Sequence, residues 1–239
     1  MSIFISFSGA ARKDFAIKFL DFFNRYGLKC WYDQHELFLG DILKQTIIDN
    51  GVDNAEYCIL LINKAYLNKK WTCEEAKRLY KKFNLRKEFT IFPILLDITK
   101  EELKNSDLSF ILEIKYQFLN TGDDITPIGL QILNRILHDI ASHSKLGDIT
   151  KALNFFKRLT LSSSLDIYNA LDIVNNFSDT NYKDKAIILI CLTNLFRTNP
   201  YKKTLNQISY LIYDKQNVSF DMFKIVESIF LISASMSIL

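Results

Sequence analysis

Cysteine, histidine, glycine and proline are all scarce in this chain of 239 residues. The four cysteines show no CxxC spacing, and none of the three histidines pairs with a cysteine or carboxylate at a metal-ligand spacing, so no metal site is predicted. The seven glycines form neither a GxGxxG nor a GxxxxGK(S/T) motif, which excludes a dinucleotide cradle or P-loop of the usual kind. No bound cofactor is therefore expected.

The chain also lacks a large excess of charge of one sign and long apolar runs. The net charge is only +3 and the lysines occur in scattered pairs, so no nucleic-acid partner is predicted. The apolar segments Ala186–Leu195 and Ile225–Leu239 are shorter than the ~20 residues that a membrane-spanning helix needs. The first is expected to be a central core helix, the second a buried or oligomer-facing one. Because Met1 is not followed by a secretory leader, a cytoplasmic protein is expected.

The first part of the chain has a regular alternation of apolar strands and amphipathic helices. The sequence predicts strands at Ile3–Ser8, Leu28–Tyr32, Tyr57–Ile62, Phe89–Leu96 and Ile114–Phe118. It predicts helices at Asp14–Tyr26, Ile42–Val52, from Trp71 onward and at Ile128–Ala141. This order predicts a flavodoxin-like, doubly wound α/β domain over residues 1–145, with a five-stranded, mostly parallel sheet. Ligands of such sheets bind outside the carboxyl ends of the strands.

The second part, residues 146–239, contains no strand-like alternation. Turn residues divide it into predicted helices at Ile149–Leu161, Leu165–Phe177, Tyr182–Thr198, Tyr201–Tyr213 and Ser219–Ser235. We therefore expect an all-helical domain that serves oligomerisation or regulation.

One predicted helix carries two adjacent glutamates that helix geometry separates. At 100° per residue, the core-facing stripe contains Thr72, Ala76, Leu79, Tyr80 and Phe83. Glu74 falls nearly opposite this stripe and should be solvated. Glu75 lies on its flank, one turn after Trp71, because residues four apart are stacked neighbours. Glu75 is thus the candidate functional carboxylate.

Taken in order, several short motifs of residues 1–143 resemble a TIR domain. They are Phe4-Ile-Ser-Phe7, Trp31-Tyr-Asp33, Glu36-Leu37, Gly40-Asp-Ile42, Tyr57-Cys-Ile-Leu-Leu-Ile62, Tyr66, Trp71-x-x-x-Glu75 and Phe92-Pro93-Ile94-Leu95. The chain departs from the family at Ala55, Asn63 and Lys70, in regions where members often carry serines, and Thr72 stands where a cysteine commonly follows the tryptophan. These departures concern substrate contacts more than the fold.

In the enzymatic TIR domains, the glutamate that matches Glu75 cleaves the nicotinamide–ribose bond of NAD+. The resemblance therefore implies that Glu75 is catalytic and that NAD+ is a substrate rather than a cofactor. A fixed carboxylate suits this chemistry, because it stabilises the positive charge of an oxocarbenium-like transition state. The alternative role of Glu75 is a surface glutamate paired with a lysine or arginine.

Four further residues are candidates for substrate binding. Phe7 and Ser8 end the first strand, where ligands of such sheets bind, although Phe7 could equally be ordinary core. Trp71 could stack on an aromatic base or cover the sheet edge. Asp33 follows the second strand, where an aspartate more commonly caps a loop or helix.

A loop over 33–41 corresponds to the interaction loop of TIR domains. Its candidate assembly residues are Glu36, Phe38, Leu39 and Gly40, of which Phe38 and Leu39 are apolar where exposure is expected. In enzymatic members this loop commonly packs against a neighbouring copy. The resemblance thus implies a homo-oligomer through TIR–TIR contacts, with the helical part as a further contact.

Three functions remain open from the sequence. The first is an NAD+ glycohydrolase or cyclase, giving nicotinamide plus ADP-ribose or a cyclic isomer, acting in bacterial anti-phage defence and activated by self-assembly. The second is a non-enzymatic TIR module that acts only through assembly. The third is hydrolysis of another nucleoside or nucleotide derivative by the same carboxylate.

Overall fold

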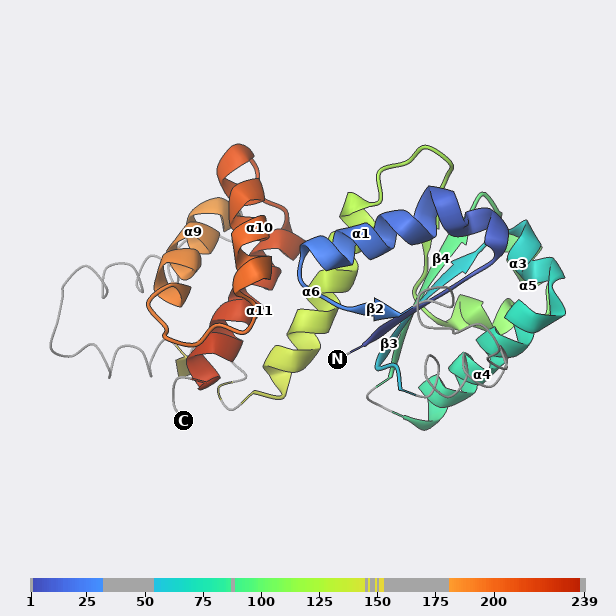
Figure 1. The fold of residues 1–239 in the computed structure, drawn as a ribbon, viewed down its shortest axis with the longest axis horizontal. Coiled ribbons are helices and arrows are strands. Elements are labelled where there is room, and N and C mark those ends of the chain that lie inside the picture. Colours follow the sequence, from blue (N-terminus) through green and yellow to red (C-terminus); the bar gives the residue numbers. More distant parts are fainter. Residues whose placement is uncertain are drawn as a thin grey trace, which may run out of the picture. The chain divides into compact units, whose positions relative to one another are not determined.

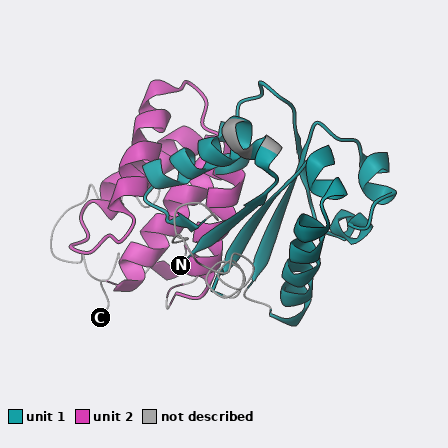
Figure 2. Ribbon diagram, turned by 45° about the vertical axis from the view of Figure 1, so that its right-hand side comes forward, with its two compact units in different colours: residues 1–129 teal, residues 130–239 magenta. Residues whose placement is uncertain are grey.

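The computed structural model describes residues 2–31, 54–86, 89–144, 146, 149, 151–152 and 181–236. The chain divides into two compact units, Met1–Gly129 and Leu130–Leu239, coloured separately in Figure 2. The break falls inside helix α6 (Thr126–Ser142). The expectation of separate domains at 1–145 and 146–239 stays a prediction.

The first unit is built on a five-stranded, all-parallel sheet (Figure 1). Its strands are β1 (Ile3–Phe7), β2 (Cys30–Trp31), β3 (Tyr57–Ile62), β4 (Thr90–Leu96) and β5 (Gln117–Leu119). Their order across the sheet is β2-β1-β3-β4-β5, and each neighbouring pair is parallel. The predicted α/β fold is confirmed, with a sheet that is entirely rather than mostly parallel.

The three central strands coincide with the longest apolar runs. All six residues of β3 are buried, as expected of a strand covered on both faces. A proline within a strand usually marks an edge or a bulge, yet Pro93 lies in β4, which has a neighbour on each side. The pairing with β5 covers only Ile94–Leu96, so Pro93 lies just outside that ladder. Its missing N–H therefore need not interrupt the pairing with β5.

The helical connection after β1 begins earlier than the sequence predicts. A 3-10 turn at Gly9–Ala11 and a π-helical turn at Arg12–Ala16 precede α1 (Ile17–Arg25). Gly27, with a φ of 80°, follows the end of α1 and adopts the left-handed conformation expected after a helix. The chain thus turns directly from the end of β1 into helical structure.

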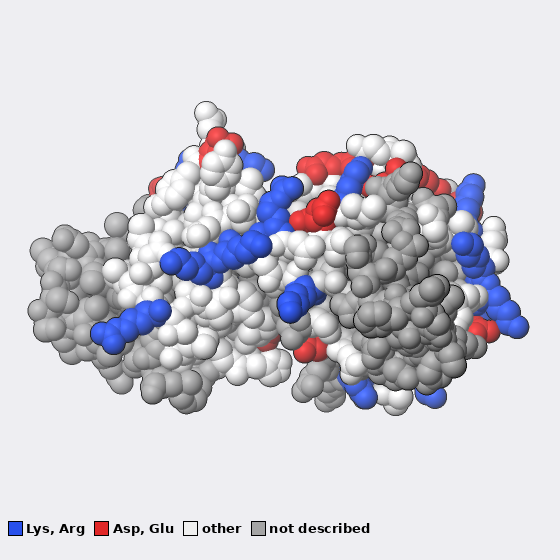
Figure 3. All heavy atoms as spheres, in the orientation of Figure 1, with Lys and Arg blue, Asp and Glu red and all other residues white. Residues whose placement is uncertain are grey.

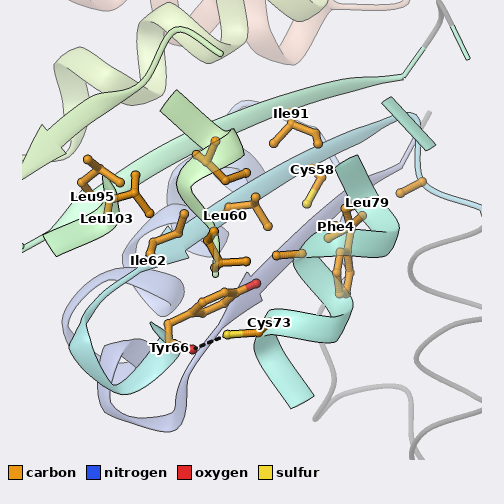
Figure 4. Packing of buried hydrophobic residues seen from close by; sticks show 14 of the residues in the cluster. Phe4, Cys58, Leu60, Ile62, Tyr66, Cys73, Leu79, Ile91, Leu95 and Leu103 are labelled. Carbon is orange, nitrogen blue, oxygen red and sulfur yellow. Dashed lines mark hydrogen bonds between the residues drawn. The ribbon is translucent and has the colours of Figure 1, made fainter. Parts of the chain in front are cut away.

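Shorter helices follow the later strands. They are α3 (Lys64–Asn68), α4 (Lys70–Leu85), α5 (Lys100–Lys104) and a 3-10 turn at Ser109–Glu113. Figure 2 shows α4 on one side of the sheet and α1 on the other. One described core cluster fills the layer between the sheet and α4 (Figure 4). It includes alternate strand residues such as Phe4, Cys58 and Leu60 together with Ala76 and Leu79 of the helix.

The buried face of α4 is rotated from the predicted stripe. Thr72, Ala76 and Leu79 are buried as expected, but so are Cys73 and Glu75. Tyr80 and Phe83 are only half-buried. The Tyr80 hydroxyl instead donates to Glu113, and its ring packs on Phe110 with centroids 4.5 Å apart. The contacts of the ring with the 3-10 turn explain why this tyrosine leaves the helix–sheet core.

The described part of the second unit is helical. After α6 come α9 (Tyr182–Thr193), α10 (Lys202–Asp214) and α11 (Phe220–Met236), and α9 and α10 both pack against α11. Helix α11 is buried over most of its length, as expected of a buried helix, and α9 buries Ala186, Leu189 and Ile190 within the predicted core segment. Helix α9 ends at Thr193, and Leu195 is 62% exposed. The segment 153–180, which contains the predicted Leu165–Phe177 helix, lies outside the described residues.

Candidate functional site

The order of the described strands reverses between β1 and β3, and the expected ligand crevice lies at this point of the carboxyl edge of the sheet. The chain leaves β1 toward β2 on one side and later returns as β3 on the other. In parallel sheets, this reversal is where ligands bind, outside the carboxyl ends of the two strands. Phe7 and Ser8 stand at the end of β1, and Asn63 stands directly after β3.

A compact corner joins β3 to the helix that carries the glutamates. The Asn63 side chain caps α3 by accepting a hydrogen bond from the Tyr66 backbone N–H, 2.8 Å away. The Thr72 hydroxyl lies 2.6 Å from the Tyr66 carbonyl and 2.9 Å from that of Lys69. The Cys73 thiol also donates to the Tyr66 carbonyl, as the dashed line in Figure 4 marks. These bonds tie the first turn of α4 to the end of α3.

Glu75 lies on the buried face of α4 and is 8% exposed. Burial raises the pKa of the Tyr66 phenol well above its usual range, and the negative charge of Glu75 raises it further. The pKa of the Cys58 thiol is also raised, mainly by burial and further by the negative charge of Glu75. Because Cys58 belongs to β3 and Tyr66 to α3, the carboxylate acts electrostatically on both the sheet and the corner.

The Tyr66 side chain contacts the first strand. Its ring is fully buried under the sheet (Figure 4), and its hydroxyl lies 2.7 Å from the Ser6 hydroxyl. Ser6 is itself 2% exposed. The hydrogen bond of this buried pair offsets much of the cost of desolvating the two hydroxyls and holds β1 and α3 together. Ser6 and Tyr66 therefore form a buried polar pair, on which the charge of Glu75 acts electrostatically.

The structure places the predicted substrate-binding residues unequally. Ser8 is 1% exposed and its hydroxyl donates to the Asn63 side-chain oxygen, 2.8 Å away. Phe7 is half-buried. Trp71 is also half-buried and packs against the core cluster below α4. Asp33, like the predicted assembly residues Glu36, Phe38, Leu39 and Gly40, lies outside the described residues. The roles given to all these residues stay predictions.

The predicted site residues did not include three polar residues of this corner, Ser6, Asn63 and Tyr66. Asn63 follows an apolar strand and precedes a short helix, which is the ordinary position of a capping asparagine, so a local signal existed. Nothing local indicates that the same side chain reaches Ser8, or that Tyr66 reaches Ser6. Those contacts join positions more than fifty residues apart.

Three other properties bear on partners and ligands. On the face drawn in Figure 3, the basic side chains lie in several separate groups, with neutral and acidic atoms between them. Within the described residues, no cluster of three histidine, cysteine or carboxylate side chains is placed to hold a metal ion. No helix of the described chain combines the length and the apolar character needed to cross a membrane.

A sequence model of the TIR domain matches residues 3–128, which is more than half of the chain. The chain belongs to the TIR domain family. The family model ends within the first turns of α6, so the described helices α9, α10 and α11 lie beyond it. The resemblance found in the sequence motifs is thereby confirmed.

Several relatives of this TIR protein carry named enzymatic activities. A probable 2′ cyclic ADP-D-ribose synthase of Methanobrevibacter olleyae is 30% identical over 110 residues, covering 46% of this chain and 31% of its own length. An NAD(+) hydrolase of Escherichia coli is 34% identical over 100 residues, covering 42% and 32%. A 2′ cyclic ADP-D-ribose synthase of Acinetobacter baumannii is 29% identical over 136 residues, covering 57% and 49%. The chain thus spans less than half the length of each of these relatives.

Proposed function

We propose that this TIR protein cleaves the nicotinamide–ribose bond of NAD+, with Glu75 as the catalytic residue. The observation that carries the proposal is a buried carboxylate on α4 of a TIR fold, close enough to Tyr66 and Cys58 for its charge to raise the pKa of both. The relatives named above, which are NAD(+) hydrolases and cyclic ADP-ribose synthases, support the same substrate.

The chemistry requires one well-placed negative charge. As the bond between C1′ of the ribose and the pyridinium nitrogen breaks, its electron pair moves to the nitrogen and nicotinamide leaves as a neutral molecule. Positive charge then develops on C1′ and the ring oxygen, and the Glu75 carboxylate stabilises it. Water attacking C1′ gives ADP-ribose and releases a proton, whereas a hydroxyl of the same molecule gives a cyclic product. No general acid is needed for the departure of nicotinamide.

Charge stabilisation by Glu75 is strong because the group is buried. In a site with little water, the interaction between a carboxylate and a developing cation is screened far less than at the surface. Trp71 lies one helical turn before Glu75 and is half-buried, and we propose that the accessible part of its indole contacts an aromatic ring of the substrate. The half-buried Phe7, at the end of β1, is proposed as a second contact, whereas Ser8 is too buried to touch the substrate directly.

The direct test compares concentrated wild type with Glu75→Gln for nicotinamide release by chromatography. Glu74→Gln is the matched control, because it removes the same charge from the neighbouring position of the same helix. We expect Glu75→Gln to lose activity by on the order of 10²- to 10³-fold and Glu74→Gln to retain it. The co-product distinguishes hydrolysis from cyclisation. Equal activity of wild type and Glu75→Gln would contradict the assignment.

Assembly and biological role are separate parts of the proposal. We expect the loop at 33–41 to mediate TIR–TIR contacts that complete the pocket, and the protein to act in anti-phage defence. The measurement is nicotinamide release as a function of protein concentration, since activity that depends on association rises more steeply than the enzyme concentration. Silence of a proven oligomer would instead favour a non-enzymatic assembly module. Cleavage of other nucleotides but not NAD+ would favour the third possibility.

A further inference from the structure

One atom, the side-chain oxygen of Asn63, joins two segments of the candidate site. It lies 2.8 Å from the Ser8 hydroxyl oxygen and 2.8 Å from the Tyr66 backbone nitrogen. A backbone N–H can only donate, so the atom that it meets must be the amide oxygen rather than the nitrogen. The Ser8 hydroxyl must then donate as well. The hydrogen-bond directions at this corner are fixed by its chemistry.

These bonds clamp the end of β1 to the corner that leads into α4. Ser6 lies in β1 and Ser8 directly follows the strand, two positions later. Tyr66 of α3 holds the Ser6 hydroxyl, and Asn63 at the start of α3 holds the Ser8 hydroxyl. The Tyr66 carbonyl in turn accepts from Thr72 in the first turn of α4. A continuous chain of hydrogen bonds therefore runs from the strand end to the helix that carries the candidate carboxylate.

Ser8 acts in this clamp as an anchor rather than as an exposed group. It is 1% exposed, while the next residue, Gly9, is exposed and has open space where a side chain would stand. The buried hydroxyl thus holds the backbone at the point where the chain turns into the crevice. If this turn shifts, the end of β1 moves relative to α4, the helix at the other end of the clamp.

We propose that Asn63 is a positioning residue for NAD+ cleavage, acting through Ser8 to fix the end of β1 relative to the helix that carries Glu75. This inference rests on the function proposed above. A clamp that sets the position of reacting groups affects the transition state more than substrate binding. Its loss should therefore lower kcat while leaving KM nearly unchanged.

The variant that isolates this role is Asn63→Ser. Serine remains a good helix N-cap, so α3 keeps its cap, but the shorter side chain cannot hold Ser8 and Tyr66 together. We expect kcat to fall by on the order of 10- to 100-fold and KM to change by less than about threefold. Asn63→Asp keeps an oxygen that accepts both bonds. It should retain kcat, while its added negative charge weakens binding of the anionic substrate and raises KM.

A double-mutant cycle with Ser8→Ala separates action through Ser8 from an independent effect. If Asn63 acts through Ser8, Asn63→Ser combined with Ser8→Ala lowers kcat no more than either change alone. Multiplied losses would overturn the inference. If Asn63→Ser does not fold, Ser8→Ala removes the same hydrogen bond from the other side and must lower kcat by itself.

Ser106→Ala is the control for general destabilisation. The Ser106 hydroxyl also joins two backbone positions, donating to the Leu103 carbonyl at 2.7 Å and accepting from the Leu108 N–H at 3.1 Å. It should lower thermal stability without lowering kcat. An unchanged kcat in Asn63→Ser overturns the positioning role while leaving NAD+ cleavage standing. Silence of wild type overturns both.

Discussion

At the scale of single residues, the Ser6–Tyr66 pair is the most buried polar contact of the site. Both hydroxyls are excluded from water, and each is the other's partner at 2.7 Å. Removing one partner leaves the other buried without a hydrogen bond, which costs more than the bond itself is worth. The pair should therefore respond to mutation as a unit.

We predict that Tyr66→Phe and Ser6→Ala each lower the free energy of unfolding by about 1–3 kcal/mol. The double variant should lose much less than the sum of the two, because no buried hydroxyl is then left without its partner. Urea unfolding followed by tryptophan fluorescence measures all three variants. Additive losses would show that the two hydroxyls do not depend on each other.

The Thr72 hydroxyl fastens α4 to the preceding corner through two carbonyls, those of Tyr66 and Lys69. Thr72→Val keeps the shape of the side chain but leaves the buried carbonyls with one donor fewer. We expect a loss of about 1–2 kcal/mol in the free energy of unfolding. Thr72→Ser keeps the hydroxyl and should lose clearly less. If the valine and serine variants are equally stable, the hydroxyl is not what holds the corner.

The helical pattern of the sequence singles out Glu75 as the candidate carboxylate but underestimates its burial. The helical wheel placed it on the flank of the apolar stripe, and the structure places it at 8% exposure. The shift arises because Tyr80 turns toward Glu113 and Phe110, so the centre of the buried face moves toward Cys73 and Glu75. A wheel assigns angles around one helix. The partners that pull an aromatic ring aside belong to another segment.

At the scale of elements, the first turns of α6 approach α1 very closely. A β-carbon built at Gly129 would lie 2.7 Å from a ring carbon of Phe22. That ring cannot easily move, because it packs edge-on against Phe23 at 5.2 Å and against Tyr26 at 4.6 Å between centroids. Glycine at this position allows the two helices to touch.

We predict that Gly129→Ala destabilises the protein. Alanine favours a helix by about 1 kcal/mol over glycine, but overpacking a filled site costs about 1–3 kcal/mol, so the steric cost prevails. In a Phe22→Leu background the clash disappears, and the same change should become neutral or stabilising. Thermal unfolding of the four proteins gives the comparison. A stabilising Gly129→Ala in the wild-type background would contradict the close contact.

The sequence predicts the central strands of the sheet more accurately than its edge strands. The central strands β1, β3 and β4 were predicted within a residue at either end, since long apolar runs define them. At the edges, the described part of the predicted strand at 28–32 begins only at Cys30, and Ile114–Phe118 became Gln117–Leu119. An edge strand pairs on one side only, so its length depends on its neighbour rather than on its own pattern. The π-helical turn after β1 has no sequence signature.

At the scale of the whole molecule, buried thiols and phenols make the first unit sensitive to alkali. Burial raises the pKa of Tyr26, Cys58, Tyr66 and Cys73, and it raises that of Cys30 to about 12. The folded state thus holds these protons more tightly than the unfolded chain. Stability is therefore complete below the ordinary thiol and phenol pKa values of 9.0 and 10.0 and falls as the pH rises through them.

We predict that the free energy of unfolding declines above about pH 9, by up to about 1.4 kcal/mol per pH unit for each group that titrates. Both tryptophans, Trp31 and Trp71, belong to the first unit, so fluorescence follows that unit alone. Cys58→Ala removes one buried thiol and should make the decline less steep. A stability that stays level between about pH 9 and 11 would contradict the prediction.

The layout of the whole chain was largely readable from sequence. Strands alternating with helices gave the TIR fold of the first unit, and the loss of alternation gave the helices of the second. The two strongly apolar segments of the second unit are helices with buried faces, α9 and α11, as the sequence predicts. Which of them is surrounded by the others depends on how three helices pack, which no single helix encodes.

The shared oxygen of Asn63 has a consequence for how this family can diversify. One atom satisfies both the strand end at Ser8 and the helix start at Tyr66. A lineage that replaces the asparagine with a shorter residue must also find another partner for the serine, or lose that serine. We therefore expect positions 8 and 63 to have changed together among close relatives, so that alignment columns far apart in the chain covary as a pair.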